Sequence, residues 1–447
     1  MRRGPYGKPA YKTDKQSSSV SFPSQFCKVQ QKPPKEHIMV VKRTLLYGFS
    51  LLQHHFNVGH PLEHFCLLRC LDVVSPAMLI QRPRSGLEIG IKTLSLSVLL
   101  THVVGLAYDL TQQEDIRVAM DIFCMLSLFS SLFARNTCLR QYQSHIIAME
   151  RLDANPGFEV GVPYAETIRH RTVTQNNRYL GWYLVSHFLT VTIYVTQNMA
   201  MQGSFVKIIT HFPIDLSGYA PALDTMTQFF YTVAGYGWAW YHAAGQLIVI
   251  VLLRFAIAEF RVFLHSLATL DEQIHDRLLL ELDGNEERVV RELLYKHARQ
   301  HSQLIVVVMH LRAILRIYSL VHFSFYMIIM AAFMARVLVI PGSSSLGMAI
   351  PVLVTIVFFL ETFGLCMLVE KLVQLNRRVS VNLYGFGWTR YLQYGHSIKR
   401  TMMLMIMQAN NTKDFSAGGL TTVSAELFAK TCRLVYTMMM GMANLAT

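Results

Sequence analysis

Cysteine and histidine are the residue types in this chain that could bind a metal or supply a nucleophile. Cys66 and Cys70 are separated by three residues and have no histidine or cysteine partner at zinc spacing, and the 18 histidines are scattered. The sequence also lacks a His/Glu metal motif, a nucleophile elbow and a phosphate-binding loop. We therefore predict no enzyme activity, no metal site and no cofactor, and we interpret the two cysteines as packing residues.

Several ionisable side chains fall inside long apolar segments, where a charge is energetically costly and often functional. Asp121 and Arg336 lie near one end of their segments, and we expect each to reach the lipid headgroups rather than to form a buried pair. Glu361 lies deeper. Arg254 and Arg316 lie toward the opposite end of their segments, where reaching the headgroups or pairing is expected.

Seven apolar segments run along the chain, and each approaches or exceeds the ~20 residues that cross ~30 Å of hydrocarbon as a helix. Apolar residues make up 52% of the sequence and charged residues 15%, which disfavours the alternative of buried core helices in a soluble protein. The sequence therefore predicts an all-α polytopic membrane protein with seven transmembrane helices. The segments are Ile89–Tyr108, Val118–Ala134, Tyr179–Ala200, Phe229–Ala258, Ala313–Leu338, Leu346–Val369 and Ser424–Leu445.

The distribution of lysine and arginine predicts the orientation of these helices. Segments on one side, including the N-terminal region, carry 33 of these residues, whereas the stretches 109–116, 201–227 and 339–345 on the other side carry Lys207 alone. The N-terminus is therefore expected inside and the C-terminus outside, opposite to a G-protein-coupled receptor. The net charge of +13 is explained by the same inside segments. No basic run is interleaved with aromatic residues, so we predict no nucleic-acid partner.

The chain divides into seven regions on this basis. They are a disordered basic tail (1–39), an amphipathic segment at the membrane interface (40–86), transmembrane helices 1–4 (87–258), a cytoplasmic helical hairpin for assembly (259–312), transmembrane helices 5–6 (313–369), a cytoplasmic loop with a helix before the last span (370–419) and the seventh, pore-lining helix (420–447).

The hairpin is predicted from apolar residues that continue at helical spacing beyond the fourth span and before the fifth. Leu267 and Leu293 belong to this stripe, and the sequence from Leu282 to Asn285 breaks it with a stop and a new helix cap. Two antiparallel helices reaching roughly 35–40 Å beyond the membrane are expected. A solvated charged pair is the alternative, but the stripe favours an assembly region, to which we also assign Trp388 as an aromatic anchor.

The C-terminal segment carries a recognisable series of motifs. The run Met405-Ile-Met-Gln-Ala-Asn is followed by Phe415-Ser-Ala-Gly-Gly-Leu-Thr-Thr-Val-Ser-Ala-Glu-Leu-Phe428 and then by Val435-Tyr436-Thr437. Ser424 is the expected cap of the last helix, with Glu426 in its first turn. This series resembles the insect odorant receptors, which show there an apolar run, a glycine-containing turn, Ser-Leu-Glu-x-Phe and a Ser-Tyr pair.

The related gustatory receptors and the odorant co-receptor match less well at the C-terminus. Gustatory receptors end in Thr-Tyr, five apolar residues and Gln-Phe, whereas this chain keeps Thr437 but has Met438, Asn444 and Leu445 at the other three places. The co-receptor closes with Gln-Leu. The resemblance therefore points to a tuning odorant receptor, and a homomeric gustatory-type channel remains the alternative. A secondary transporter is a further alternative, for which the sequence shows no paired inverted repeats.

The resemblance implies an odorant-gated, non-selective cation channel, formed as a heterotetramer with co-receptor subunits in the plasma membrane of sensory-neuron dendrites. It also implies a pocket for a small volatile organic ligand in the outer half of the helix bundle. Such a pocket needs apolar and aromatic walls with a few polar groups, although interfacial or packing roles are the alternative for each aromatic residue. The candidate ligand-binding residues are Phe123, Tyr194, Gln197, Asn198, Tyr231, Tyr236, Trp238 and Met348.

The resemblance further implies that the last helix lines a central pore for permeant cations. Gly441 stands where the co-receptor has an apolar gate residue, and Asn444 stands where it has a glutamine. The residues that share this face of the helix by their spacing are Leu434, Thr437, Gly441, Asn444 and Leu445. Lys430 and Arg433 are expected to point away from the conduit or into a wide water-filled vestibule.

Overall fold

The structure of the chain is a computed structural model. It describes residues 65–76, 84–153, 163–202, 221–280, 285–339, 345–385, 387–411 and 414–446. The predicted basic tail (1–39) and the first part of the predicted interfacial segment therefore lie outside the described residues.

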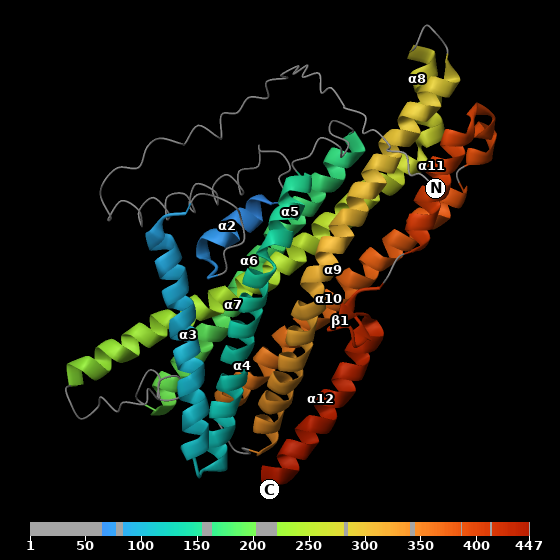
Figure 1. Ribbon diagram of the computed structural model, residues 1–447. Coiled ribbons are helices and arrows are strands. Elements are labelled where there is room, and N and C mark those ends of the chain that lie inside the picture. The colour runs from blue at the N-terminus through green and yellow to red at the C-terminus, as the bar shows by residue number, and fades with distance from the viewer. Residues whose placement is uncertain are drawn as a thin grey trace, which may run out of the picture.

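Long helices occupy all seven of the predicted membrane segments, as Figure 1 shows. They are α3 (Gly86–Gln112), α4 (Ile116–Gln141), α6 (Pro163–Gln202), α7 (Pro221–Ala268), α9 (Glu286–Val339), α10 (Ser345–Gly385) and α12 (Ala425–Ala446). Within the described residues, four stretches are long and apolar enough to cross a membrane, namely Gly86–Gln112, Val118–Gln141, Glu286–Leu338 and Pro351–Gly385. The prediction of an all-α polytopic membrane protein is confirmed.

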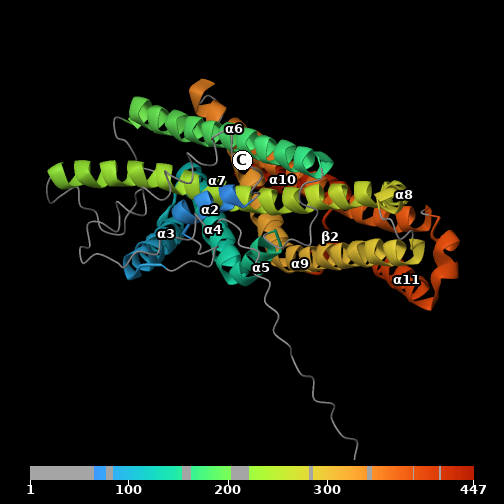
Figure 2. The same ribbon diagram turned by 90° about the horizontal axis from the view of Figure 1, so that it is seen from above.

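The helices form an elongated bundle in which the connections gather at two ends (Figure 1). The turn between α3 and α4, the end of α9 and the C-terminus lie at one end, and α8 (Leu270–Leu280) and α11 (His396–Asn410) lie at the other. This arrangement matches the two sides inferred from the lysine and arginine distribution. Seen from above, α7 lies between α6 and α9 (Figure 2).

Helices α7 and α9 are central because they are apolar around most of their circumference. The middle of α7 is almost fully buried, including Leu247, Leu252 and Phe255, and α9 contributes Leu311 and Tyr318 to the same core. α4 and α12 pack against α9, while α6 and α10 pack against α7. Every other long helix except α3 therefore contacts one of these two central helices, and α3 packs on α4.

The stretch 259–312, predicted as a helical hairpin for assembly, contains parts of three helices. α7 continues to Ala268, α8 follows after a single turn residue, and α9 returns from Glu286. The Arg288 amide donates to the Asn285 side-chain oxygen at 3.1 Å, which confirms the predicted new helix cap. Leu267 and Leu293 are buried within this chain. They can therefore support assembly only by shaping the hairpin.

The segment after α10 contains a short β-hairpin that was not predicted from the sequence. A 3₁₀ helix, η1 (Trp388–Tyr394), and α11 are followed by a two-stranded antiparallel hairpin of β1 (Ser416–Ala417) and β2 (Thr421–Thr422). Gly418 has φ +64° in its turn, and its amide donates to the Arg316 carbonyl of α9 at 2.6 Å. The hairpin thus fixes the start of α12 on α9. The Leu427 amide donates to Ser424 Oγ at 3.3 Å, as predicted for the cap.

Two short helices complete the described chain. α5 (Gln143–Asp153) continues the line of α4 and packs on α9. α2 (Cys66–Val74) packs on α7, with the rings of Phe65 and Phe255 5.1 Å apart. Both carboxylate oxygens of Asp72 accept from Arg84 at 3.0 Å, so the charge that interrupts the apolar face of this segment is paired.

Candidate functional site

Five helices bring polar side chains together in the middle of the apolar bundle. Each helix contributes one residue, and all five side chains are buried or nearly so: Arg135 from α4, His187 from α6, His242 from α7, Tyr326 from α9 and Glu361 from α10. We call these residues the polar cluster. A buried charge is stable only when it is paired and hydrogen-bonded, so the contacts of each member decide what the cluster can do.

Tyr326 joins the two charged members of the cluster. Arg135 donates to the Tyr326 hydroxyl, and that hydroxyl donates to Glu361 Oε2. Arg135 also donates to the His242 carbonyl at 3.1 Å, and its guanidinium lies 5.5 Å from the centre of the Tyr326 ring. The phenol therefore carries a charge-assisted connection between α4 and α10 across α9.

The two histidines continue the chain of hydrogen bonds. Arg135 Nη1 lies 3.2 Å from His242 Nε2, and since a guanidinium can only donate, Nε2 accepts. His187 Nδ1 lies 2.9 Å from the Tyr183 carbonyl and must therefore donate. The remaining contact, 2.9 Å between His242 Nδ1 and His187 Nε2, is then a donation from His242 to His187. Both rings are neutral in this assignment.

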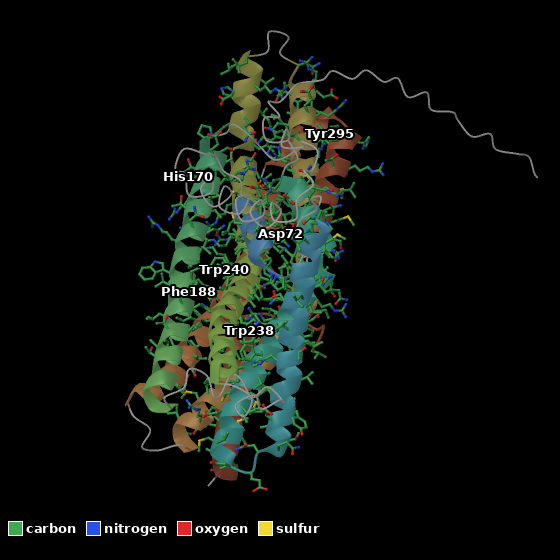
Figure 3. All side chains as sticks on the ribbon, turned by 90° about the vertical axis from the view of Figure 1, so that its left-hand side faces the viewer. Asp72, His170, Phe188, Trp238, Trp240 and Tyr295 are labelled. Carbon is green, nitrogen blue, oxygen red and sulfur yellow. The ribbon has the colours of Figure 1, made fainter. Side chains whose placement is uncertain are left out.

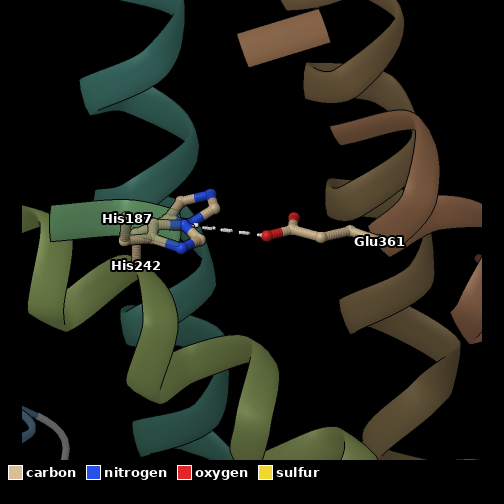
Figure 4. Close-up of side chains that lie close together, drawn as sticks. All are labelled: His187, His242 and Glu361. Atoms are coloured by element: carbon tan, nitrogen blue, oxygen red, sulfur yellow. Dashed lines mark hydrogen bonds and ion pairs between the residues drawn. The ribbon is translucent and has the colours of Figure 1, made fainter. Parts of the chain in front are cut away.

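The second oxygen of Glu361 faces the histidines. Its Oε1 lies 3.8 Å from His187 Nε2 and 3.8 Å from His242 Nδ1 (Figure 4). This oxygen is buried and accepts no hydrogen bond from the part of the chain that the structure describes. The three donor atoms lie within 4.8 Å of one another, so together they could hold a metal ion.

Glu361 was predicted from the sequence as an intramembrane charge, but the histidines that meet it were not predicted. His187 and His242 fall inside the third and fourth predicted spans, so the rule that singled out Glu361 could also have singled them out. Arg254, expected to reach the headgroups or pair, donates to Gln175 of α6, and its guanidinium lies 4.9 Å from the centre of the Tyr179 ring.

The expectation for Asp121 and Arg336 was wrong. The two side chains form an ion pair between α4 and α9, with one contact of 3.3 Å between Arg336 Nη2 and Asp121 Oδ2. Their exposed fractions are 19% and 23%. Because α4 and α9 lie side by side, two charges near the same end of these helices face each other, and pairing is then favoured over separate solvation.

The predicted ligand-binding residues fall into two places. Trp238 is buried where α7 meets α3 and α4, with its ring 4.9 Å from His102 and 4.8 Å from Phe129 (Figure 3). Phe123 packs in a separate cluster with residues of α9 and α10, including Tyr326. α4 therefore separates the two. Tyr194, Gln197, Asn198, Tyr231, Tyr236 and Met348 lie on helices whose side chains are outside the described part at these positions.

The predicted pore residues share one uncovered face of α12. Leu434, Thr437, Gly441 and Asn444 are exposed, whereas the opposite face packs on α9 and α10. The packed residues are Phe428, Thr431, Val435, Met438 and Met442. The side chain of Leu445 is outside the described part, as is that of Trp388 in the predicted assembly region.

The charged residues of α12 belong to the same uncovered side. Lys430 lies four residues before Leu434, and Arg433 lies four residues before Thr437, so the helical period places both near the predicted pore face. Lys430 pairs with Glu426 at 2.7 Å. These side chains do not point into the bundle, which leaves the water-filled vestibule as the remaining expectation for them.

An all-α bundle of long apolar helices, with a buried polar cluster and a last helix that has one uncovered face, defines a polytopic membrane protein. Residues 115–436 match the family model described as 7tm Odorant receptor, and the chain belongs to that family. It is therefore a chemosensory receptor of the ion-channel type found in this family.

Solved structures of the insect olfactory receptor OR5 from Machilis hrabei have the same fold. One is the complex with eugenol and another is the receptor described without it. Each matches with a TM-score of 0.64 at 12% identity, over 92% of this chain and 100% of the other. No curated protein sequence matches the chain.

Proposed function

We propose that this chain is the odour-tuning subunit of a ligand-gated, non-selective cation channel and that it opens a central pore together with co-receptor subunits in the plasma membrane. The family membership supports a chemosensory receptor channel, and the proposal adds the tuning role, the partner and the pore. The observation that carries it is the uncovered face of α12.

In a single chain this face is exposed, whereas the opposite face of α12 packs on α9 and α10. Thr437, Gly441 and Asn444 supply a hydroxyl, a gap and an amide along the face, and no Cβ-sized obstacle lies within 4 Å of Gly441. Four such helices around an axis would produce a channel lined by small and polar groups, which suits the passage of hydrated cations. Co-receptor helices would supply the apolar residues that close it.

The ligand is proposed to be a small volatile organic molecule bound in the outer half of the bundle. OR5 from Machilis hrabei, which has this fold, is in complex with eugenol in one of its structures. In this chain Trp238, with Phe129 and His102, supports an aromatic wall between α3, α4 and α7. The predicted residues of α6 and the first part of α7 would complete it.

Electrical recording in cells that express the chain with and without a co-receptor tests this proposal. We expect odour-evoked cation current only in cells that contain both proteins, and odour selectivity that changes when this chain is replaced by another receptor. Current from the chain alone would instead identify a homomeric, gustatory-type channel. Substrate uptake without channel current would identify a transporter.

A further inference from the structure

His187, His242 and Glu361 lie in the bundle, and neither the predicted pore nor the predicted ligand site uses them. We propose that they form a binding site for a divalent transition metal ion, with Zn²⁺ as the ion whose ligand preference they fit best. The site joins α6, α7 and α10 (Figure 4). It does not depend on the tuning role or on the co-receptor.

The donor atoms are of the right kind and nearly at the right separation. Two imidazole nitrogens and one carboxylate oxygen form the ligand set of many zinc sites that keep a fourth position for water. Zn²⁺ bonds of about 2.0–2.2 Å in a tetrahedron place neighbouring donors about 3.3 Å apart. The three separations here are 2.9, 3.8 and 3.8 Å, so shifts of a few tenths of an ångström would bring the atoms around an ion.

Each ligand is also held from its other side, as metal-bound side chains usually are. His187 Nδ1 donates to the Tyr183 carbonyl, so its ring lone pair is on Nε2, which accepts from His242 and would turn to the ion when that donation ends. Glu361 Oε2 accepts from Tyr326, which leaves Oε1 for the ion. Oε1 is the buried atom that accepts no hydrogen bond from the described residues, so an ion would satisfy it.

His242 must change its tautomer when the ion binds. Its Nδ1 hydrogen, which is donated to His187 in the absence of metal, moves to Nε2. Nε2 lies 3.2 Å from the Tyr326 hydroxyl, which can accept it while still donating to Glu361. The proton is thus retained in the protein, but Arg135 Nη1 and His242 Nε2 are then both donors at 3.2 Å, so the hydrogen bond between Arg135 and the His242 ring is lost.

Arg135 is the feature that opposes the ion. Its Nη1 lies 3.2 Å from His242 Nε2, at the edge of the ring away from the metal position. Its charge is already compensated through Tyr326 by Glu361, so the bound ion adds positive charge to a buried region. We therefore expect micromolar rather than nanomolar affinity.

The test is a titration of the purified full-length receptor with Co²⁺, followed by displacement with Zn²⁺. Co²⁺ in a tetrahedral nitrogen and oxygen site absorbs visible light, so binding is seen without any measurement of channel current. We expect one Co²⁺ per chain, a rise in the unfolding temperature with metal concentration, and loss of the absorption when Zn²⁺ is added.

Variants locate the binding. Glu361→Gln and His187→Gln should each weaken Co²⁺ binding by more than about tenfold, while the control His102→Gln, which removes a buried histidine of α3, should leave it unchanged. Absence of stoichiometric Co²⁺ binding by the unmodified receptor at millimolar metal would overturn the proposal without reference to any variant. Undiminished binding in folded Glu361→Gln would overturn it as well. Neither outcome would affect the channel function proposed above.

Discussion

His301 lies in the hairpin extension of α9, where its ring stacks on Phe263 of α7 with 5.7 Å between the ring centres. Neither ring nitrogen has a hydrogen-bond partner among the described residues. Burial lowers the pKa of His301 from its ordinary 6.5 to about 4, because the protonated ring would lose its hydration. The residue is thus neutral in the folded protein throughout the physiological range.

Stability is therefore expected to fall as the pH drops below 6.5. In that range the unfolded chain takes up a proton on His301 and the folded chain does not, so the loss grows until the pH reaches about 4. At pH 5.5 the loss amounts to about 1.4 kcal/mol. His301→Gln should reduce the difference in unfolding temperature between pH 7.5 and 5.5, and the exposed control His170→Gln should not. Equal pH dependence in the His301 variant and the unmodified protein would show that this ring is not buried.

Substitution of Trp238, a single residue, tests the predicted ligand-binding site. Trp238→Ala should change the odour concentration that gives half-maximal current, but it should leave the current evoked by a co-receptor agonist unchanged. Trp182 on α6 is 77% exposed, so Trp182→Ala is the matched control and should change neither quantity.

Truncation of Trp238 also opens a cavity that destabilises the protein by about 3–5 kcal/mol. The same measurements are therefore made on Trp238→Phe, which keeps an aromatic ring beside His102 and leaves a smaller cavity. A loss of surface expression in both variants, with no shift in sensitivity where protein remains, would identify Trp238 as a packing residue.

Residue pairs were the part of the site least accessible from the sequence. Asp121 and Glu361 could be singled out because a charge within an apolar segment is unusual. Their partners, Arg336 and the polar cluster, depend on which helices are neighbours, and nothing in the local pattern of one helix specifies this. Hydrogen-bonded histidines such as His242 are also compatible with ordinary core packing when they are seen in sequence alone.

At the level of elements, α6 and α7 are joined by a buried ion pair. Arg169 donates to the two carboxylate oxygens of Glu259 at 2.8 and 2.7 Å, and Glu259 is 1% exposed. Removing one member of a buried pair leaves the other charge uncompensated, at about 3–5 kcal/mol. Glu259→Gln should therefore lower the unfolding temperature markedly.

The exposed ion pair between α8 and α9 provides a control for the substitution of Glu259. Arg277 and Glu292 are 3.3 Å apart and about half exposed, at 44% and 50%. Exposed pairs contribute about 0–1 kcal/mol, so Glu292→Gln should have little effect on the same measurement. Equal effects of the two substitutions would mean that α6 does not pack on α7 as described.

Helices were predictable because their signals are local. Apolar runs of sufficient length located all seven long helices, and capping residues located the starts of α9 at Asn285 and of α12 at Ser424. The β1–β2 hairpin was missed because each strand has two residues, too few to show any periodicity. Its glycines were interpreted as a turn, and the strands form because the turn docks on Arg316 of α9.

At the scale of the whole molecule, the two ends of the bundle follow the charge distribution that the sequence shows. The α7–α9 hairpin and α11 lie at one end, and the C-terminus with the α3–α4 turn lies at the other (Figure 1). What the sequence could not show is how one chain divides its apolar surface between its own core and its partners. The hairpin stripe is buried within the chain, whereas the α12 face is left uncovered.

We propose that this α12 face lines the cation pathway, and Asn444 tests the proposal because it is exposed near the end of that face. The measurement is the reversal potential and unit conductance of odour-evoked current in cells that also express the co-receptor. A fixed charge in a narrow, poorly screened ring acts strongly on permeant ions. Asn444→Asp should therefore raise cation permeability, especially for divalent ions, and Asn444→Lys should reduce the current, whereas Asn444→Gln should leave both quantities near the unmodified values. Unchanged reversal potential and conductance in both charged variants, with normal surface expression, would show that this face of α12 does not line the pore.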